Sequence, residues 1–83
     1  MPPRLRRSFH SARYRVFLRL LRQARRDAGL TQVEVCAALD RPQSYVSKCE
    51  SGERRVDVIE LAEFARLYRK PVSFFLRGAG KLP

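Results

Sequence analysis

Apolar residues recur at helical intervals near the start of the chain. Gly29 then supplies the left-handed residue that commonly ends a helix. No segment alternates apolar and polar residues as a strand does. We therefore expect an all-α chain with a first helix over about 12–28. Its apolar face comprises Tyr14, Phe17, Leu18, Leu21, Arg25 and Ala28, with Arg15, Arg19, Arg22 and Arg26 mostly opposite.

Two capping boxes mark further helix starts. Thr31 is followed three residues later by Glu34, and Asp57 by Glu60, so that each pair of side chains satisfies free backbone N–H groups reciprocally. Pro71 suits the start of a short last helix. We expect the later helices over about 31–39, 42–51, 58–68 and 71–76.

The expected helices 31–39 and 42–51 are joined by the short turn Asp40–Arg41, with Pro42 at the first position of the second helix. Two helices joined in this way indicate a helix-turn-helix, whose second helix enters the major groove of DNA. An ordinary solvated helix face is the alternative. The outward side chains that can bond base edges are Gln43, Ser44, Ser47 and Lys48.

Positive charge is concentrated at the two ends of the 83-residue chain, whose formal net charge is +10. Residues 1–26 contain nine arginines and no acidic residue, whereas 27–63 contain eight acidic and four basic residues. Such an excess predicts a polyanionic partner, with nucleic acid favoured over a membrane. We expect a flexible basic arm over 1–13, one domain over 14–77 and a short tail over 78–83.

The basic arm has three interpretations. It follows the DNA backbone or minor groove, it is a solvated tail, or it is an acid-free targeting segment. The last is disfavoured because its cleavage would remove part of the first helix. No stretch reaches the ~18 apolar residues that a membrane span needs.

Catalytic and metal-binding patterns are missing from the sequence. Cys36 and Cys49 lack CxxC spacing and neighbouring histidines, and His10 is solitary. We expect both cysteines to be buried free thiols. No Ser/His/Asp, Cys/His or paired-carboxylate arrangement is present. We therefore expect that the protein is not an enzyme and that it binds no metal or cofactor.

The run from Arg25 to Gly52 resembles the Cro/phage-repressor family, also called the Xre-like helix-turn-helix family. The resemblance covers about residues 20–76 and implies a compact five-helix fold of the lambda-repressor-like type. Asp40 departs from the usual Gly at the turn, where Asp tolerates the left-handed conformation better than most residues. Cys36 stands where the family usually has Ala. The matching residues are Gly29-Leu30-Thr31-Gln32, Glu34-Val35-Cys36, Leu39, Gln43-Ser44-Tyr45-Val46-Ser47 and Glu50-Ser51-Gly52.

The resemblance also implies roles for single side chains. Arg25 and Glu50 match the family's ion pair between the first helix and the recognition helix. Gln32 matches a residue that binds a backbone phosphate. A loop that follows the DNA backbone in the family is matched by Ser51, Arg54 and Arg55. Tyr45, larger than the common residue, is expected to bond a phosphate or stack on a sugar. The expected phosphate contacts are Arg22, Thr31, Gln32, Tyr45, Ser51, Arg54 and Arg55.

The expected function is sequence-specific transcriptional regulation, as a bacterial repressor in the cytoplasm, associated with the nucleoid. One helix-turn-helix reads few base pairs, so we expect a homodimer on double-stranded DNA with half-sites about 34 Å apart. Phe74, Phe75 and Leu76 are the expected dimer surface, the alternative being that they close the core. Two other functions stay open: an antitoxin or interaction module with a protein partner, and a basic amphipathic helix acting at membranes.

Overall fold

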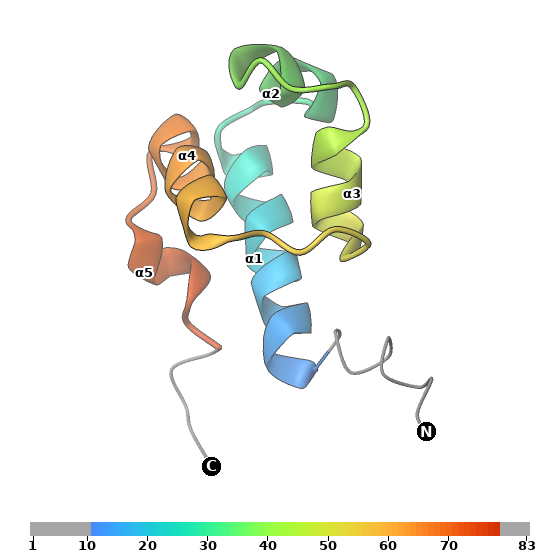
Figure 1. Ribbon diagram of the computed structural model, residues 1–83. Helices are drawn as coiled ribbons and strands as arrows, with labels where there is room; N and C mark the ends of the chain where they lie inside the picture. Colours follow the sequence, from blue (N-terminus) through green and yellow to red (C-terminus); the bar gives the residue numbers. More distant parts are fainter. Residues whose placement is uncertain (1–10, 79–83) are drawn as a thin grey trace, which may run out of the picture.

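A computed structural model describes residues 11–78 as an arrangement of five helices (Figure 1). No strand occurs in that range, so the prediction of an all-α fold is confirmed. The greater part of the expected arm and tail, including His10, lies outside the described residues. The helices are α1 (Ala12–Asp27), α2 (Gln32–Ala38), α3 (Tyr45–Ser51), α4 (Val58–Tyr68) and α5 (Val72–Phe75).

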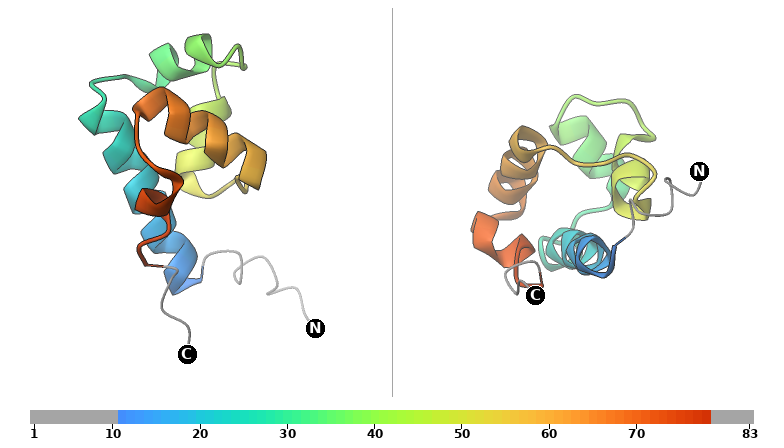
Figure 2. Two further views of the ribbon diagram at one scale, coloured as in Figure 1. Left: turned by 90° about the vertical axis from the view of Figure 1, so that its left-hand side faces the viewer. Right: turned by 60° about the horizontal axis from the view of Figure 1, so that its bottom comes forward.

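Helix α1 organises the fold because it contacts α3, α4 and α5. In Figure 1, α3 lies to the right of α1, α4 and α5 lie to its left, and α2 lies above its C-terminal end. Figure 2 shows the same arrangement, with α1 between α3 and α5 in its right-hand view. The fold therefore places one flank of α1 beside the recognition helix and the other beside α5.

Aromatic rings join these helices in the core. Tyr45 of α3 stacks on Phe64 of α4 with ring centroids 5.9 Å apart, and Phe64 stacks on Tyr68 at 5.7 Å. On the other side of α1, the rings of Phe17 and Phe75 lie 6.5 Å apart. Such pairs contribute roughly 0.5–1.5 kcal/mol each beyond their area burial, which fixes α4 and α5 against the rest.

The buried face of α1 differs from the expected one at its C-terminal end. Ala24 is fully buried, whereas Ala28, expected on the apolar face, is exposed. The reason is that α1 ends at Asp27, and the chain turns away through Gly29 at φ +74°. At the other end, Ser11 Oγ accepts a hydrogen bond from Tyr14 N and caps α1, which starts at Ala12 as expected.

Both capping boxes are present. The Thr31 hydroxyl accepts from Glu34 N at 3.1 Å, and the Glu34 carboxylate accepts from Thr31 N at 2.8 Å. Asp57 and Glu60 form the same reciprocal pair at 2.8 and 3.0 Å. Helix α4 has the expected bounds, and α2 ends one residue before Leu39. Local side-chain-to-backbone bonds therefore set these helix starts.

Helix α3 begins at Tyr45, three residues later than expected. Asp40 takes the left-handed conformation at φ +56°, and Arg41 N still bonds back to the Cys36 carbonyl of α2. A turn closed by Tyr45 N and the Pro42 carbonyl then precedes the first helical bond. Pro42 is therefore in the turn and not in the helix, because the chain needs these residues to leave α2.

The last helix ends in two buried phenylalanines. Pro71 is its cap and not its first residue. Phe74 is 7% exposed and Phe75 is fully buried, whereas Leu76 is 45% exposed. The expectation that all three form a dimer surface is therefore wrong. Phe74 and Phe75 close the core, and only Leu76 is accessible to a partner.

Candidate nucleic-acid interface

The inner face of the helix-turn-helix is apolar and closely packed. Val35 and Cys36 of α2 and Val46 and Cys49 of α3 are buried, and the Cys36 thiol donates to the Gln43 carbonyl at 3.3 Å. Both cysteines are free, as expected. Burial raises the pKa of the Cys49 thiol because it disfavours the thiolate. The two thiols therefore pack the crossing of α2 and α3.

The outward face of the unit carries the four expected base-contacting side chains. Gln43, Ser44, Ser47 and Lys48 are all exposed, with Gln43 and Ser44 in the turn before α3. Ser47 Oγ donates to the Ser44 carbonyl at 3.1 Å, which occupies its hydroxyl proton. Gln43 and Lys48 are the longer side chains of this surface, and so extend furthest from it.

A buried carboxylate fixes the last turn of α3 to α1. Glu50 is 2% exposed and accepts from Arg25 Nε at 2.6 Å and from Nη2 at 3.2 Å. The hydrogen bond with Glu50 raises the pKa of Arg25. Arg25 also donates to the Leu30 carbonyl at 2.9 Å, which ties in the start of α2. The ion pair that the family resemblance implied is present.

Two expected phosphate-binding residues also converge on Glu50. Gln32 Nε2 donates to Glu50 Oε1 at 2.9 Å, and Arg22 Nη1 donates to the Glu50 carbonyl oxygen at 3.0 Å. The sequence did not reveal either bond, because the partners are 18 and 28 residues apart. Both side chains lie beside the last turn of α3.

Tyr45 is in the core and not on the DNA-facing surface. The residue is 6% exposed, and its buried hydroxyl has no hydrogen-bond partner within residues 11–78. Burial raises the pKa of Tyr45. The expectation of a phosphate contact is therefore wrong. Position 45 is one turn before Cys49, so it shares the inward face of α3.

Arg41 and Arg54 cover the Tyr45 ring from the turn and from the loop after α3. Their guanidinium carbons lie 4.7 and 5.1 Å from the ring centroid. Cations at this distance from an aromatic face are attracted by its quadrupole. The two arginines thus close the edge of the core between α3 and α4.

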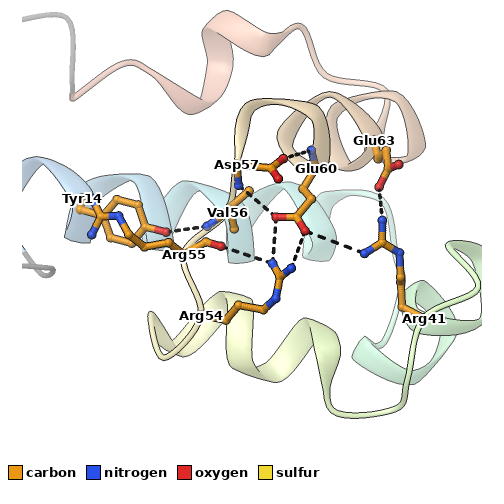
Figure 3. Close-up of polar contacts among 8 residues, drawn as sticks. All are labelled: Tyr14, Arg41, Arg54, Arg55, Val56, Asp57, Glu60 and Glu63. Atoms are coloured by element: carbon orange, nitrogen blue, oxygen red, sulfur yellow. Dashed lines mark hydrogen bonds and ion pairs between the residues drawn. The ribbon is translucent and has the colours of Figure 1, made fainter.

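Carboxylates of α4 hold the same two arginines (Figure 3). Arg54 Nη2 lies 2.7 Å from Glu60 Oε2, Arg41 lies 3.8 Å from the same oxygen, and Arg41 Nη2 lies 3.0 Å from Glu63. The hydrogen bond from Arg54 lowers the pKa of Glu60. Only the local capping role of Glu60 was visible in the sequence. Its ion pairs depend on how α4 packs beside the loop.

The loop between α3 and α4 is fixed to α1 by Tyr14 (Figure 3). The Tyr14 hydroxyl accepts from Val56 N at 3.1 Å, and the Arg55 guanidinium lies 4.2 Å from the ring centroid. Ser51 is exposed, with its hydroxyl bonded to the Lys48 carbonyl and to Glu53 N. Thr31, also exposed, caps α2. These contacts give the loop and the start of α2 defined positions.

Comparison with known proteins places these features in one family. A helix-turn-helix domain family model matches residues 16–72. A solved structure, an XRE-family like protein from Pseudomonas syringae pv. tomato str. DC3000, is 44% identical. The match covers 95% of this chain and 98% of that chain, with a TM-score of 0.79. The chain belongs to the XRE family of helix-turn-helix proteins.

This XRE-family domain is a DNA-binding domain of a non-enzymatic family. Comparison with curated protein sequences gave no match. Within residues 11–78, no group of three or more His, Cys, Asp or Glu could hold a metal ion. Among the helices of that range, none is long and apolar enough to cross a membrane.

Proposed function

We propose that this domain is a sequence-specific transcriptional repressor that acts on the bacterial nucleoid and binds a pseudo-palindromic operator as a dimer. The observation that carries the proposal is an exposed polar face, formed by α3 and the turn before it, backed by a buried, closely packed inner face. Gln43 and Lys48 project outward, while buried Glu50 holds the helix to Arg25. A reading helix held in this way presents its side chains to the major groove in one geometry.

In the proposed complex, different residues provide sequence specificity and affinity. Gln43 bonds an adenine edge and Lys48 a guanine edge, which gives about 1–3 kcal/mol of discrimination per good contact. Lys48 is the only cation within α3. Most of the salt-dependent affinity therefore comes from side chains around α3 that bind phosphates. Arg22, Thr31, Gln32, Ser51, Arg54 and Arg55 remain the proposed phosphate-binding residues.

The proposed dimer surface moves from the buried phenylalanines to a groove beside them. A groove of about 540 Å³ is lined by apolar side chains that include Tyr14, Phe17 and Leu61. Val72 and Leu76 of the α5 region line it too and are 41% and 45% exposed. A second copy of the chain is the occupant that fits a two-fold operator, because one helix-turn-helix reads too few base pairs for specificity.

The test is selection of bound sites from randomised duplex DNA, followed by affinity measurements. We expect a two-fold symmetric motif with half-sites about 34 Å apart. Gln43→Ala should lower the preference for one base pair in each half-site by about 10- to 100-fold. The matched control is Gln23→Ala, the same change at an exposed position of α1, and it should leave the base preference unchanged. Absence of any motif, or an unaltered preference in Gln43→Ala, contradicts the proposal.

A further inference from the structure

Four arginines form a stripe along α1, here called the arginine stripe: Arg15, Arg19, Arg22 and Arg26. Their spacing of four, three and four residues places them one above another on a single helix face. The stripe spans about 16 Å, given a rise of about 1.5 Å per residue. Arg22 is half-buried and the other three are exposed.

The stripe places like charges close together along one face of α1. Residues 12–26 contain no acidic side chain, and Asp27 at the end of α1 bonds Gln23 and Lys70 instead. Within residues 11–78, Arg19 and Arg26 form no ion pair. Like charges three or four residues apart destabilise a helix. An anion bound along the stripe would relieve that repulsion.

The arginine stripe lies beside the recognition helix. Arg22, the third residue of the stripe, donates to the Glu50 carbonyl in the last turn of α3, so the stripe passes beside the end of the recognition helix. Figures 1 and 2 show α1 and α3 side by side. The opposite flank of α1 is covered near Val16, which Gly78 approaches closely. The stripe therefore extends the surface of α3 and not that of α5.

We infer that the arginine stripe is a second DNA-binding surface, which binds backbone phosphates flanking the base pairs under α3. The inference rests on the DNA-binding function proposed above. Guanidinium groups suit phosphate because they bond it through two parallel N–H groups. About 16 Å corresponds to roughly five base pairs at 3.4 Å each. The length of the stripe therefore fits the stretch of duplex that extends beyond the recognition helix.

A membrane surface fits the stripe less well. Basic amphipathic helices bind bilayers by burying their apolar face among the lipids. In α1 that face is already in the core, since Phe17, Leu18, Leu21 and Ala24 are buried. Only the charged side is available to a partner. This also disfavours the membrane function that the sequence left open.

The experiment compares two duplexes that carry the selected operator, one ending at the motif and one extended on both sides. Wild-type protein should bind the extended duplex more tightly. The double variant Arg19→Gln/Arg26→Gln keeps good helix formers and should lose most of that gain. The slope of log affinity against log salt on the extended duplex should fall by about 1.8, or about 0.9 for each phosphate contact. Base preference should not change.

A matched control removes two charges elsewhere. Arg66→Gln/Arg77→Gln alters exposed arginines outside the stripe and should keep the gain from flanking DNA. Thermal unfolding provides a separate readout. At low salt, Arg19→Gln/Arg26→Gln should unfold at an equal or higher temperature than wild type, because like-charge repulsion is relieved. Weaker DNA binding with undiminished stability separates a binding role from a structural one.

The outcomes distinguish this inference from the proposed function. If wild type shows no preference for the selected operator, the function itself is wrong and the inference falls with it. If wild type binds specifically but the stripe variant keeps the flanking gain, or the control loses it equally, only the inference is wrong. Vesicles of phosphatidylglycerol are the second probe. Vesicle binding that the stripe variant abolishes, with the flanking gain intact, would overturn the inference in favour of a membrane.

Discussion

Arginines on the two sides of α3 differ in their partners. On the α4 side, Arg41 and Arg54 are held by the buried carboxylate of Glu60. On the α1 side, exposed Arg19 and Arg26 form no ion pair within the described residues. Arg41 and Arg54 stabilise the fold, and the neighbouring carboxylate of Glu60 offsets their charge. Arg19 and Arg26 extend into solvent, where they are accessible to a phosphate.

The difference shows that the partners of a cation decide its role more than its position in the sequence does. Arg54 follows the recognition helix, where the family resemblance expects a phosphate contact. Its guanidinium, however, donates a hydrogen bond to the Glu60 carboxylate, and this bond raises the pKa of Arg54 above its ordinary value. A DNA phosphate would have to compete with this carboxylate. The contact stays a prediction, while the positioning of the loop is visible in the structure.

The largest expected effect comes from removing the carboxylate that holds Arg25. Glu50→Ala leaves a partly buried guanidinium without its partner and should lower the free energy of unfolding by about 3–5 kcal/mol. Urea unfolding followed by circular dichroism measures it. Lys70→Ala, which breaks the more exposed pair with Asp27, is the control and should have a far smaller effect. Equal losses in both variants would show that burial does not separate the two kinds of pair.

A smaller loss is expected when Glu60 loses its charge. Glu60→Gln weakens the bonds from Arg54 and Arg41 but keeps a side-chain oxygen for the cap. It should lower the free energy of unfolding by about 2 kcal/mol at pH 7, the range for hydrogen bonds to charged groups. A change within experimental error would indicate that the arginines around Tyr45 are held by the ring alone.

The pH dependence of the same variant sharpens the comparison. The folded protein holds the pKa of Glu60 below its ordinary value of 4.5, chiefly through Arg54. The stabilisation is therefore present above about pH 4.5 and is lost as the pH falls through the lower folded pKa. Unfolding measured from pH 7 to 2 should show a shallower acid loss in Glu60→Gln than in wild type. Asp27, whose pKa is also lowered, supplies part of the remaining slope.

The smallest expected effect concerns the buried hydroxyl of Tyr45. Tyr45→Phe removes an oxygen without a hydrogen-bond partner and keeps the ring that Arg41 and Arg54 contact. The free energy of unfolding should stay the same or rise by up to about 1 kcal/mol, because an unsatisfied buried hydroxyl is costly. DNA affinity should not change. A drop in affinity with intact stability would restore the phosphate contact that the sequence suggested.

Local features of the fold were readable from the sequence. The capping boxes at Thr31 and Asp57 and the glycine after α1 were all predicted, and each is present. These signals act between residues at most four apart, so no knowledge of packing is needed. The Arg25–Glu50 pair spans 25 residues and came only from the family resemblance.

Tertiary structure decided which side chains are available to a partner. Tyr45, Phe74 and Phe75 were expected at interfaces, and all three are buried. Helix α4 packs against Tyr45, and α1 packs against Phe75. The second role of Glu60 likewise requires α4 to lie beside the loop after α3. Helical periodicity gives the direction of a side chain on its own helix. What that side chain meets depends on helices far away in the chain, and packing alone determines it.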